Sequence, residues 1–296
     1  MPMSADRSAL ETFQRQMLPC IESALDGFCP AAPNILSEAM RYSLLLPGKR
    51  IRPLLVLMAA DACSGNTDVA LPAACAAEMV HVFSLIHDDV PAMDDDDLRR
   101  GKPTNHKVYG EAQAILAGDG LLALAFEVLS EEISEAAIAI NCVHELAVAS
   151  GPLGMSGGQS EDMAGLPADS GIKKVRSLHA KKTGALIRCC LRMGAITASA
   201  SQDQLKSLTV YGEQLGVAFQ ITDDLLDVTG NADAAGKKVG KDQAAGKITY
   251  PMLLGVNGSR KAAKEAVDAA IDALVVFGEK AGHLQEVGEY VLRRER

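Results

Sequence analysis

Two short clusters of aspartates have the residue type and spacing to bind a divalent cation. The first aspartate cluster consists of Asp88, Asp89 and Asp94, and the second consists of Asp223, Asp224 and Asp227. Carboxylates placed side by side repel each other, so such a cluster either takes up protons or holds a cation. Ligands that are all oxygen favour Mg²⁺, which proteins usually bind through one or two carboxylates plus substrate phosphates.

The second aspartate cluster fits one face of a helix. Asp223 and Asp227 are four residues apart, so they lie about 40° apart around a helix axis. Gln220 precedes Asp223 by three residues and joins the same face. We therefore expect an amide and two carboxylates to point in a similar direction.

The first aspartate cluster does not fit a regular helix. Asp88 and Asp94 are six residues apart and would lie on different faces. Pro91 stands between them and cannot donate a helical hydrogen bond to the carbonyl of His87, so the helix must break or bulge there. Such a break would allow Asp94 to turn back toward Asp88. The acidic run 95–97 that follows is, taken alone, typical of a solvated helix end.

Each cluster stands at the end of a long apolar segment. From Leu71 to Ile86 nearly every residue is apolar or small. The stretch from Leu205 to Val228 is similar and is preceded by the capping-box pair Ser201 and Gln204. A helix that is apolar on all sides is buried. The sequence therefore predicts two central helices with carboxylates at their ends.

The composition favours helices over strands. The 296-residue chain is 48% apolar but only 4% aromatic, and it lacks Trp, whereas strands are enriched in aromatic and β-branched residues. Glycines and prolines divide the chain into about ten helical runs, and none of the breaks has the length and polarity of an interdomain linker. We find no internal repeat. These features predict an all-α protein with a single domain.

Charge and cysteine content limit the function classes. Acidic residues outnumber basic ones by 38 to 29, which argues against a nucleic-acid binder. The seven cysteines include no C-x-x-C pair, so we expect neither a disulfide framework nor a zinc site, and a reducing cytoplasm fits best. The N-terminal residues show no signal-peptide core, and we find no apolar run of the roughly 20 residues that a membrane span needs.

Basic residues near the aspartates are numerous enough to bind two diphosphate groups: Lys49, Arg52, Arg99, Arg100, Lys182, Lys238 and Lys247. An Arg side chain matches phosphate oxygens with a planar fork of donors, whereas Lys supplies a compact charge. His81 is either a core-facing histidine or part of such a basic pocket, and its position in the sequence does not decide between them.

Two segments resemble the motifs of a known family. Residues 81–106, HVFSLIHDDVPAMDDDDLRRGKPTNH, are similar to the first aspartate-rich region of the trans-isoprenyl diphosphate synthases, and FQITDDLLD, residues 219–227, is similar to the second. The resemblance extends from about Met40 to Pro251 and points to the bacterial farnesyl and plant-like geranylgeranyl members. It implies the isoprenoid synthase fold, a large bundle of about ten or more helices around a central cavity. The implied domain is a single polyprenyl synthetase domain over residues 1–296.

The resemblance also implies roles for the site residues. The aspartates of both clusters would hold Mg²⁺, about three ions per active site. The allylic diphosphate would be bound by Arg99, Lys238 and Lys247, and the catalytic residues would be Lys182, Thr183 and Gln220. Isopentenyl diphosphate would occupy a metal-free basic pocket formed by Gly48, Lys49, Arg52, His81 and Arg100. A further segment resembles the family's G-Q-x-x-D motif, and we expect its role to be structural: Gly157, Gly158, Gln159 and Asp162.

The implied activity is short-chain prenyl transfer, in which isopentenyl diphosphate condenses with dimethylallyl or geranyl diphosphate and diphosphate is released. Phe83, five residues before Asp88, and its neighbour Ser84 would limit product length, a pattern similar to bacterial farnesyl diphosphate synthases. We therefore predict a farnesyl product, with geranylgeranyl synthesis as the main alternative. A terpene cyclase would lack the second motif, and a non-catalytic partner subunit would usually have lost motif aspartates. Related enzymes are homodimers, and we expect one here.

Overall fold

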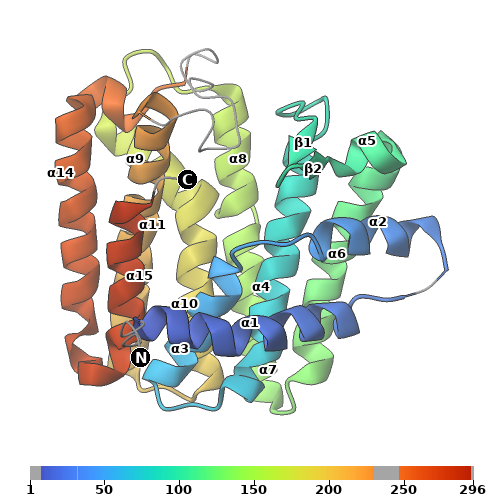
Figure 1. The fold of residues 1–296 in the computed structure, drawn as a ribbon. Coiled ribbons are helices and arrows are strands. Elements are labelled where there is room, and N and C mark those ends of the chain that lie inside the picture. The colour runs from blue at the N-terminus through green and yellow to red at the C-terminus, as the bar shows by residue number, and fades with distance from the viewer. Residues whose placement is uncertain (1–7, 32, 230–246, 295–296) are drawn as a thin grey trace, which may run out of the picture.

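The computed structural model describes residues 8–31, 33–229 and 247–294, and these are almost entirely helical (Figure 1). The strands in this part are β1 (Leu98–Arg99) and β2 (Lys102–Pro103), which pair in antiparallel fashion. The π-helix η1 (Ala180–Gly184) joins α9 to α10, and the 3₁₀-helix η2 (Leu274–Ala281) joins α14 to α15. The α-helices are α1 (Ala9–Phe28), α2 (Ile35–Leu44), α3 (Ile51–Ala62), α4 (Thr67–Asp88), α5 (Asn105–Tyr109), α6 (Glu111–Glu132), α7 (Ala136–Ser150), α8 (Met155–Ala164), α9 (Ile172–His179), α10 (Ala185–Thr197), α11 (Gln202–Thr229), α14 (Tyr250–Ala273) and α15 (Gly282–Arg293). The prediction of an all-α fold with about ten or more helices is confirmed.

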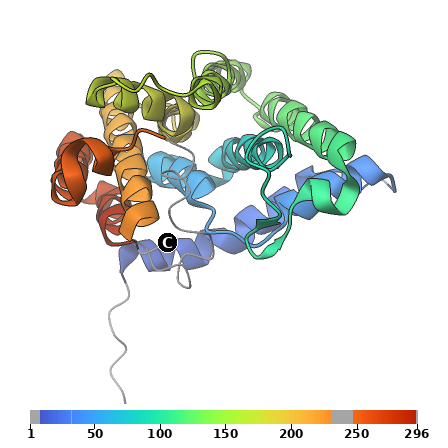
Figure 2. The same cartoon turned by 90° about the horizontal axis from the view of Figure 1, so that it is seen from above.

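Helices α3 and α4 lie at the centre of the molecule. Seen from above, their ribbons are surrounded by those of the other helices (Figure 2). α4 packs against α3, α6 and α10, and its residues 72–80 are all buried. α3 is equally apolar, with residues 53–60 buried. Burial on every side explains why these two helices lack the polar face of a surface helix.

The second apolar segment forms the long helix α11. It packs against α10 on one side and α14 on another. Its N-terminus carries the predicted capping box, because the Gln204 amide donates to Ser201 Oγ (3.2 Å) and the Ser201 amide donates to Gln204 Oε1 (2.9 Å). Both helices predicted from the sequence are therefore present, and each ends in an aspartate cluster. The expected central position is right for α4 but wrong for α11, which has an exposed face that includes Val210 (37% exposed).

The expectation that no segment has the length and apolarity of a membrane span is wrong. Three segments meet that criterion by length and composition: 67–88, 111–132 and 136–164. In the most apolar window of the first, α4, 67% of the residues are buried inside the protein, so packing in the core accounts for its apolar character. The shares for the second and third segments are 44% and 28%.

Candidate active site

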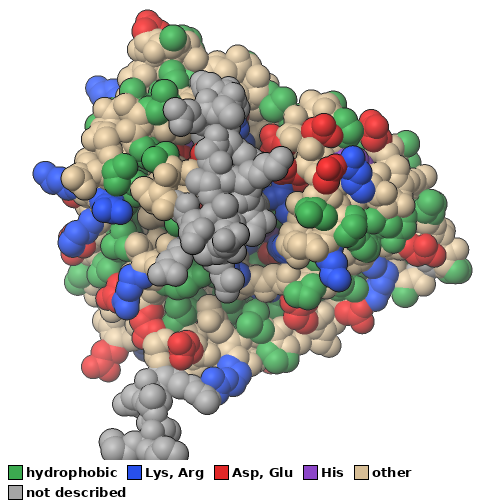
Figure 3. Space-filling model, turned by 45° about the horizontal axis from the view of Figure 1, so that its top comes forward, with side chains coloured by type: hydrophobic (Ala, Val, Ile, Leu, Met, Phe, Trp, Pro, Cys, Tyr) green, Lys and Arg blue, Asp and Glu red, His purple; other side chains and the backbone are tan. Residues whose placement is uncertain are grey.

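A central cavity of about 970 Å³ lies between α3, α4, α8, α9, η1, α11 and the segment 247–249. α4 ends, and the β1–β2 hairpin begins, at the top of Figure 1. With this end turned forward, Figure 3 shows acidic and basic side chains close together. The cavity brings together most of the predicted site residues: Arg52, His81, Phe83, Ser84, Asp88, Asp94, Arg99, Lys182, Thr183, Gln220, Asp223, Asp224 and Lys247.

The predicted break after the first two aspartates is present. α4 ends at Asp88, and Pro91 lies in the turn that follows. The turn folds back, because the Asp94 amide donates to the Asp88 carbonyl at 2.8 Å. Both residues line the central cavity, as the sequence analysis anticipated from the position of the proline.

Asp88 sits in a polar but largely buried position. Its Oδ1 accepts a hydrogen bond from Gln159 Nε2 of α8 at 2.9 Å. Burial raises the pKa of Asp88 to about 6, and the nearby carboxylate of Asp94 acts in the same direction, while Lys182 opposes the shift. A positive charge bound in the cavity would favour the ionised carboxylate.

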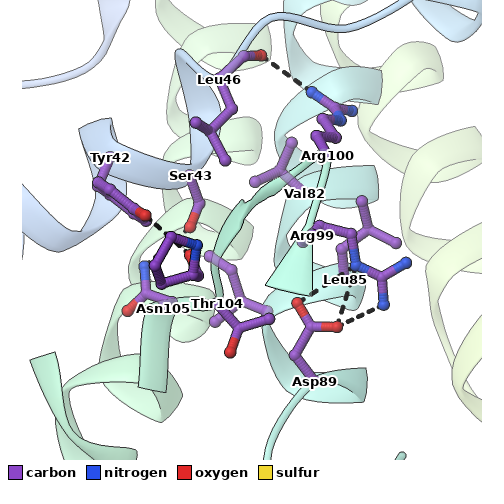
Figure 4. Close-up of a pocket in the computed structure, with 12 residues that line it drawn as sticks. Tyr42, Ser43, Leu46, Val82, Leu85, Asp89, Arg99, Arg100, Thr104 and Asn105 are labelled. Atoms are coloured by element: carbon purple, nitrogen blue, oxygen red, sulfur yellow. Dashed lines mark hydrogen bonds and ion pairs between the residues drawn. The ribbon is translucent and has the colours of Figure 1, made fainter. Parts of the chain in front are cut away.

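Asp89 points away from the central cavity. Its side chain is 4% exposed and pairs with Arg99, whose Nε donates to Oδ1 at 3.0 Å and whose Nη2 makes a second contact (Figure 4). Burial raises the pKa of Asp89, and the hydrogen bonds from Arg99 oppose that effect. The two residues border a second cavity of only about 20 Å³ between α2, α4 and the hairpin, room for about one water molecule.

The second aspartate cluster is also divided. Asp223 lines the central cavity, and its Oδ2 accepts a hydrogen bond from Gln220 Nε2 at 3.2 Å. Asp224 also lines the cavity but is only 6% exposed, and its Oδ2 accepts a hydrogen bond from the backbone N–H of Tyr250 at 2.9 Å, at the start of α14. Asp227 lies one turn further along α11 and is not among the described residues that line the cavity.

Two predicted lysines are joined by a carboxylate from α8. Lys182 Nζ and Lys247 Nζ both donate to Asp162 Oδ2, at 2.7 and 3.0 Å. Burial would raise the pKa of Asp162, but the two lysines together lower it below its ordinary value. Lys238, the third lysine predicted for this side, lies outside the described residues.

The G-Q-x-x-D segment combines a structural and a functional position. A Cβ on Gly158 would lie 2.3 Å from the backbone nitrogen of Lys182, so a glycine is required for α8 to approach η1. This close approach of two helices agrees with the structural role expected of the segment. The sequence analysis missed that Gln159 and Asp162 on the same helix reach into the cavity, where they contact Asp88 and the two lysines.

The predicted basic pocket is only partly open to the central cavity. Arg52 and His81 line it, and Arg52 Nε is buried with no hydrogen-bond partner among the described residues. Burial and the nearby arginines, Arg52 first, hold the pKa of His81 well below its ordinary value, so the ring is neutral near pH 7. The cavity position of His81 therefore favours the pocket over the simple core histidine.

The remaining residues of that pocket lie just outside the cavity lining. Arg100 Nη1 donates to the Leu46 carbonyl at 3.0 Å (Figure 4). A Cβ on Gly48 would lie 2.5 Å from Arg100 Nη1, so a larger residue at this position would displace the Arg100 guanidinium. Lys49 Nζ is 5.8 Å from the centroid of the Tyr290 ring.

A buried carboxylate beneath these residues was also missed. Glu78 is 1% exposed, and its Oε1 accepts a hydrogen bond from Arg50 Nη1 at 2.7 Å and lies 3.7 Å from Arg100 Nη2. Arg50 is itself fully buried and also pairs with Glu22. The sequence held a signal for this network, because Glu78 is a charged residue in the middle of the most apolar helix.

Phe83 and Ser84 both line the central cavity one turn before Asp88. The Phe83 ring packs edge-to-face against His87, with ring centroids 4.9 Å apart. Ser84 Oγ donates to the His81 carbonyl at 2.8 Å, so its hydroxyl is satisfied within the helix. The large side chain is therefore the one that can restrict the space available to a ligand.

Comparison with known proteins agrees with this geometry. A model of the polyprenyl synthetase family matches residues 33–283. The chain belongs to this family. Its trans-isoprenyl diphosphate synthase character, predicted from the two motifs, is confirmed. A short-chain prenyltransferase activity follows, with prenyl diphosphates as substrates.

Relatives within the polyprenyl synthetase family carry two kinds of product name. The chain is 43% identical to geranylgeranyl pyrophosphate synthase 11 of Arabidopsis thaliana, over 98% of this chain and 85% of the relative. It is also 43% identical to a farnesyl diphosphate synthase of Geobacillus stearothermophilus, over 88% and 90%. The crystal structure of an FPP/GFPP synthase from Zymomonas mobilis superposes with a TM-score of 0.86 at 39% identity and covers 96% of this chain and 98% of that one.

The donor set fits the way in which proteins bind Mg²⁺ together with a diphosphate. Within residues 8–31, 33–229 and 247–294, no three His, Cys, Asp or Glu side chains converge closely enough to hold a metal ion by themselves. Mg²⁺ usually needs only one or two carboxylates and takes its remaining oxygens from phosphates and water. Asp88, Asp94 and Asp223 line the cavity and offer carboxylate oxygens of that kind.

Proposed function

We propose that this chain condenses isopentenyl diphosphate with dimethylallyl and geranyl diphosphates to make farnesyl diphosphate, with release of diphosphate. The observation that carries the proposal is one cavity in which charged groups of both aspartate clusters and Lys182 meet the aromatic ring of Phe83. Charged groups bind the diphosphate, while apolar side chains accommodate the hydrocarbon chain and exclude water from a carbocation.

The difficult step in this reaction is the separation of charge as diphosphate leaves the allylic carbon. Lys182 and Lys247 are held side by side by Asp162, which places two cationic donors at the cavity wall. Preorganised donors stabilise a growing negative charge better than water does. We assign the Thr183 hydroxyl and the Gln220 amide to the support of the allylic cation. The departing diphosphate takes the final proton, so no side chain is assigned as a base.

We also propose that the aspartates that line the cavity, Asp88, Asp94, Asp223 and Asp224, bind Mg²⁺, about three ions per active site. When bound, the ions supply positive charge that stabilises the diphosphate as it leaves. Support comes from the donor set, which is all oxygen, and from the raised pKa of Asp88, about 6, which a neighbouring cation would lower again. Removal of divalent ions with EDTA should abolish turnover, and added Mg²⁺ should restore it.

The farnesyl product is supported by Phe83 on the cavity wall, whereas the relatives named geranylgeranyl pyrophosphate synthases support the longer product. The deciding assay incubates labelled isopentenyl diphosphate and Mg²⁺ with five-, ten- and fifteen-carbon allylic diphosphates and sizes the dephosphorylated alcohols. We expect the five- and ten-carbon primers to be extended to fifteen carbons. Accumulation of a twenty-carbon alcohol from all three primers would establish geranylgeranyl synthesis instead.

Substitution of Phe83 tests the residue that is proposed to limit product length. Phe83→Ala should lengthen the product, because it removes a ring from the cavity wall. Phe126→Ala is the matched control, since Phe126 on α6 is partly buried but does not line the cavity. An unchanged product spectrum in Phe83→Ala would refute this assignment while leaving prenyl transfer itself intact.

We propose a homodimer in a reducing cytoplasm. Large apolar side chains are exposed on α6 and α7, namely Ile115 (46%), Leu116 (49%), Ile140 (63%) and Val148 (42%), and exposed apolar groups of this kind mark protein interfaces. All seven cysteines are free, as a reducing compartment requires. Light scattering should give twice the chain mass, and Ile140→Glu should lower it; a monomeric native protein would exclude the dimer.

A further inference from the structure

Arg294, immediately after α15, reaches the second aspartate cluster. Its Nη2 donates to Asp223 Oδ1 at 2.6 Å and to the Phe219 carbonyl at 2.6 Å. Its Nε and Nη2 also donate to Thr222 Oγ1, at 3.0 and 2.7 Å. One guanidinium therefore contacts three residues within a single turn of α11.

The Arg294 side chain is fixed from several sides. It is 6% exposed, and its guanidinium carbon lies 3.9 Å from the centroid of the Phe219 ring. α15 packs directly against α11, beside which it runs in Figure 1. The Arg294 amide continues the helical pattern by donating to the Tyr290 carbonyl at 3.0 Å. A buried guanidinium with this many acceptors is preorganised and loses little additional freedom when its partner binds a ligand.

The position of the guanidinium relative to the cavity decides what it can do. Asp223 lines the central cavity, whereas Arg294 is not among the described residues that line it. Arg294 therefore holds the carboxylate from behind, while Gln220 Nε2 donates to the other oxygen at 3.2 Å. An ionised carboxylate offers about four acceptor positions, so a carboxylate that is hydrogen-bonded at both oxygens can still coordinate a cation.

The first aspartate cluster contains an arginine in a different position. Arg99 pairs with Asp89, which faces away from the central cavity, and no arginine hydrogen bond to Asp88 is present in the described part of the chain. In the second cluster Arg294 instead holds Asp223, an aspartate that lines the cavity. A hydrogen-bonding partner behind a metal-binding carboxylate orients it, and loss of such a partner typically weakens metal affinity by about 10- to 100-fold.

We propose that Arg294 is a positioning residue, which orients the Asp223 carboxylate toward the cavity so that it binds a divalent cation together with a diphosphate. This inference rests on the proposed function, because it gives Arg294 a role in the same Mg²⁺-dependent site. It extends that site to the C-terminal end of the described chain, which no aspartate or lysine motif indicates.

The test measures binding of Mg²⁺ and inorganic pyrophosphate by calorimetry, together with the Mg²⁺ dependence of turnover. Arg294→Gln should weaken binding by about 10- to 100-fold and raise the half-saturating Mg²⁺ concentration, with a smaller change in kcat at saturating Mg²⁺. Arg294→Lys keeps the charge but not the planar fork and should give an intermediate value. Arg293→Gln is the matched control, because the guanidinium of Arg293 is 73% exposed and pairs with Glu289, four residues earlier on α15; this variant should bind like the native protein.

The proposal would be overturned if Arg294→Gln bound Mg²⁺ and pyrophosphate as tightly as the native chain or more tightly. Arg294 would then only stabilise the fold, or would compete with the cation for Asp223. Thermal unfolding of each variant without ligand shows whether it is folded, and Arg294→Lys carries the test if Arg294→Gln is not. Failure of the proposed function has a different signature, because the native chain would then extend none of the allylic primers.

Discussion

The two aspartate clusters reach the same cavity from different backbones. α4 stops at Asp88, so the first cluster lies in a turn, whereas α11 continues to Thr229 and carries the second cluster on an unbroken helix. In each cluster, the two adjacent aspartates have different surroundings. Asp88, Asp223 and Asp224 line the central cavity and Asp89 does not, while Asp89 and Asp224 are the two that are buried against other groups of the protein.

The clusters differ in what the buried aspartate of each pair, Asp89 or Asp224, binds. Asp89 forms a buried ion pair with Arg99, which ties the end of α4 to the β1–β2 hairpin. Asp224 accepts a backbone N–H from Tyr250, which ties α11 to the start of α14. The buried aspartate of each pair thus holds the fold together, whether or not it also lines the cavity, and substitutions should separate this role from ligand binding.

The largest effect is expected at Asp88. Asp88→Asn should lower kcat/KM by roughly 10⁴-fold, about 5 kcal/mol, because the cavity loses a carboxylate. The same change should raise the free energy of unfolding at pH 8 by about 1 to 3 kcal/mol, since burial raises the pKa of Asp88 to about 6 and makes its ionised form unfavourable in the fold. Steady-state kinetics and urea unfolding measure the two quantities.

The control for this variant is Asp169→Asn, at an exposed position between α8 and α9, which should change neither quantity. If Asp88→Asn were active but unstable, the division of roles between Asp88 and Asp89 would be the reverse of the one described.

A loss of stability is expected at Asp89. Asp89→Ala should lower the free energy of unfolding by about 4 kcal/mol, because it leaves the Arg99 guanidinium, 15% exposed, without its buried partner. The double variant Asp89→Ala/Arg99→Met should recover part of that loss by removing the uncompensated charge. Urea unfolding of these two variants and of Arg99→Met gives the coupling energy of the pair, and equal losses in Asp89→Ala and the double variant would show that the unpaired guanidinium is not the source of the loss.

The sequence predicts the helices of this comparison well. The helices over the apolar segments 71–86 and 205–228, the capping box at Ser201 and the break near Pro91 depend on local patterns, and all are present. Which aspartate of a pair is buried against the fold is not a local property. Neighbouring residues lie about 100° apart on a helix, and partners from other segments, Arg99 for Asp89 and the Tyr250 amide for Asp224, decide between them.

The residues that the sequence analysis missed show the same limit. Asp162 joins two lysines that are distant from it in sequence, and Arg294 reaches α11 from the far end of the chain. Long-range pairs of this kind carry no periodic signal. Glu78 is different, because a lone carboxylate inside an apolar helix already indicates a buried partner, which proves to be Arg50.

His179, whose Nε2 lies 4.0 Å from Asp224 Oδ1, should make the stability of the protein depend on pH. His179 stacks on Tyr250, and burial lowers the pKa of His179 from 6.5 to about 4, with Lys182 and Lys247 acting in the same direction and Asp162 opposing. Below pH 6.5 the folded protein then binds fewer protons than the unfolded chain. The free energy of unfolding should therefore be highest above pH 6.5 and should fall by up to about 3 kcal/mol as the pH drops toward 4.

Urea unfolding at pH 7, 5.5 and 4.5 measures this dependence. His179→Phe keeps an aromatic ring beside Tyr250 and should flatten the curve, whereas His144→Gln, at an exposed position on α7, should leave it unchanged. A curve that is equally steep in His179→Phe would assign the effect to other groups.

The smallest effect is expected at Asp224. Thr249, the residue before α14, makes no side-chain capping bond, so the Asp224 carboxylate satisfies the Tyr250 N–H in its place. Asp224→Ala should therefore cost about 1 to 2 kcal/mol in urea unfolding and speed hydrogen exchange at the Tyr250 amide. Asp224→Asn keeps an acceptor oxygen and should cost less. A loss as large as that of Asp89→Ala would mean that the backbone cap and the buried ion pair stabilise their clusters equally. The proposed distinction between Asp89 and Asp224 would then be wrong.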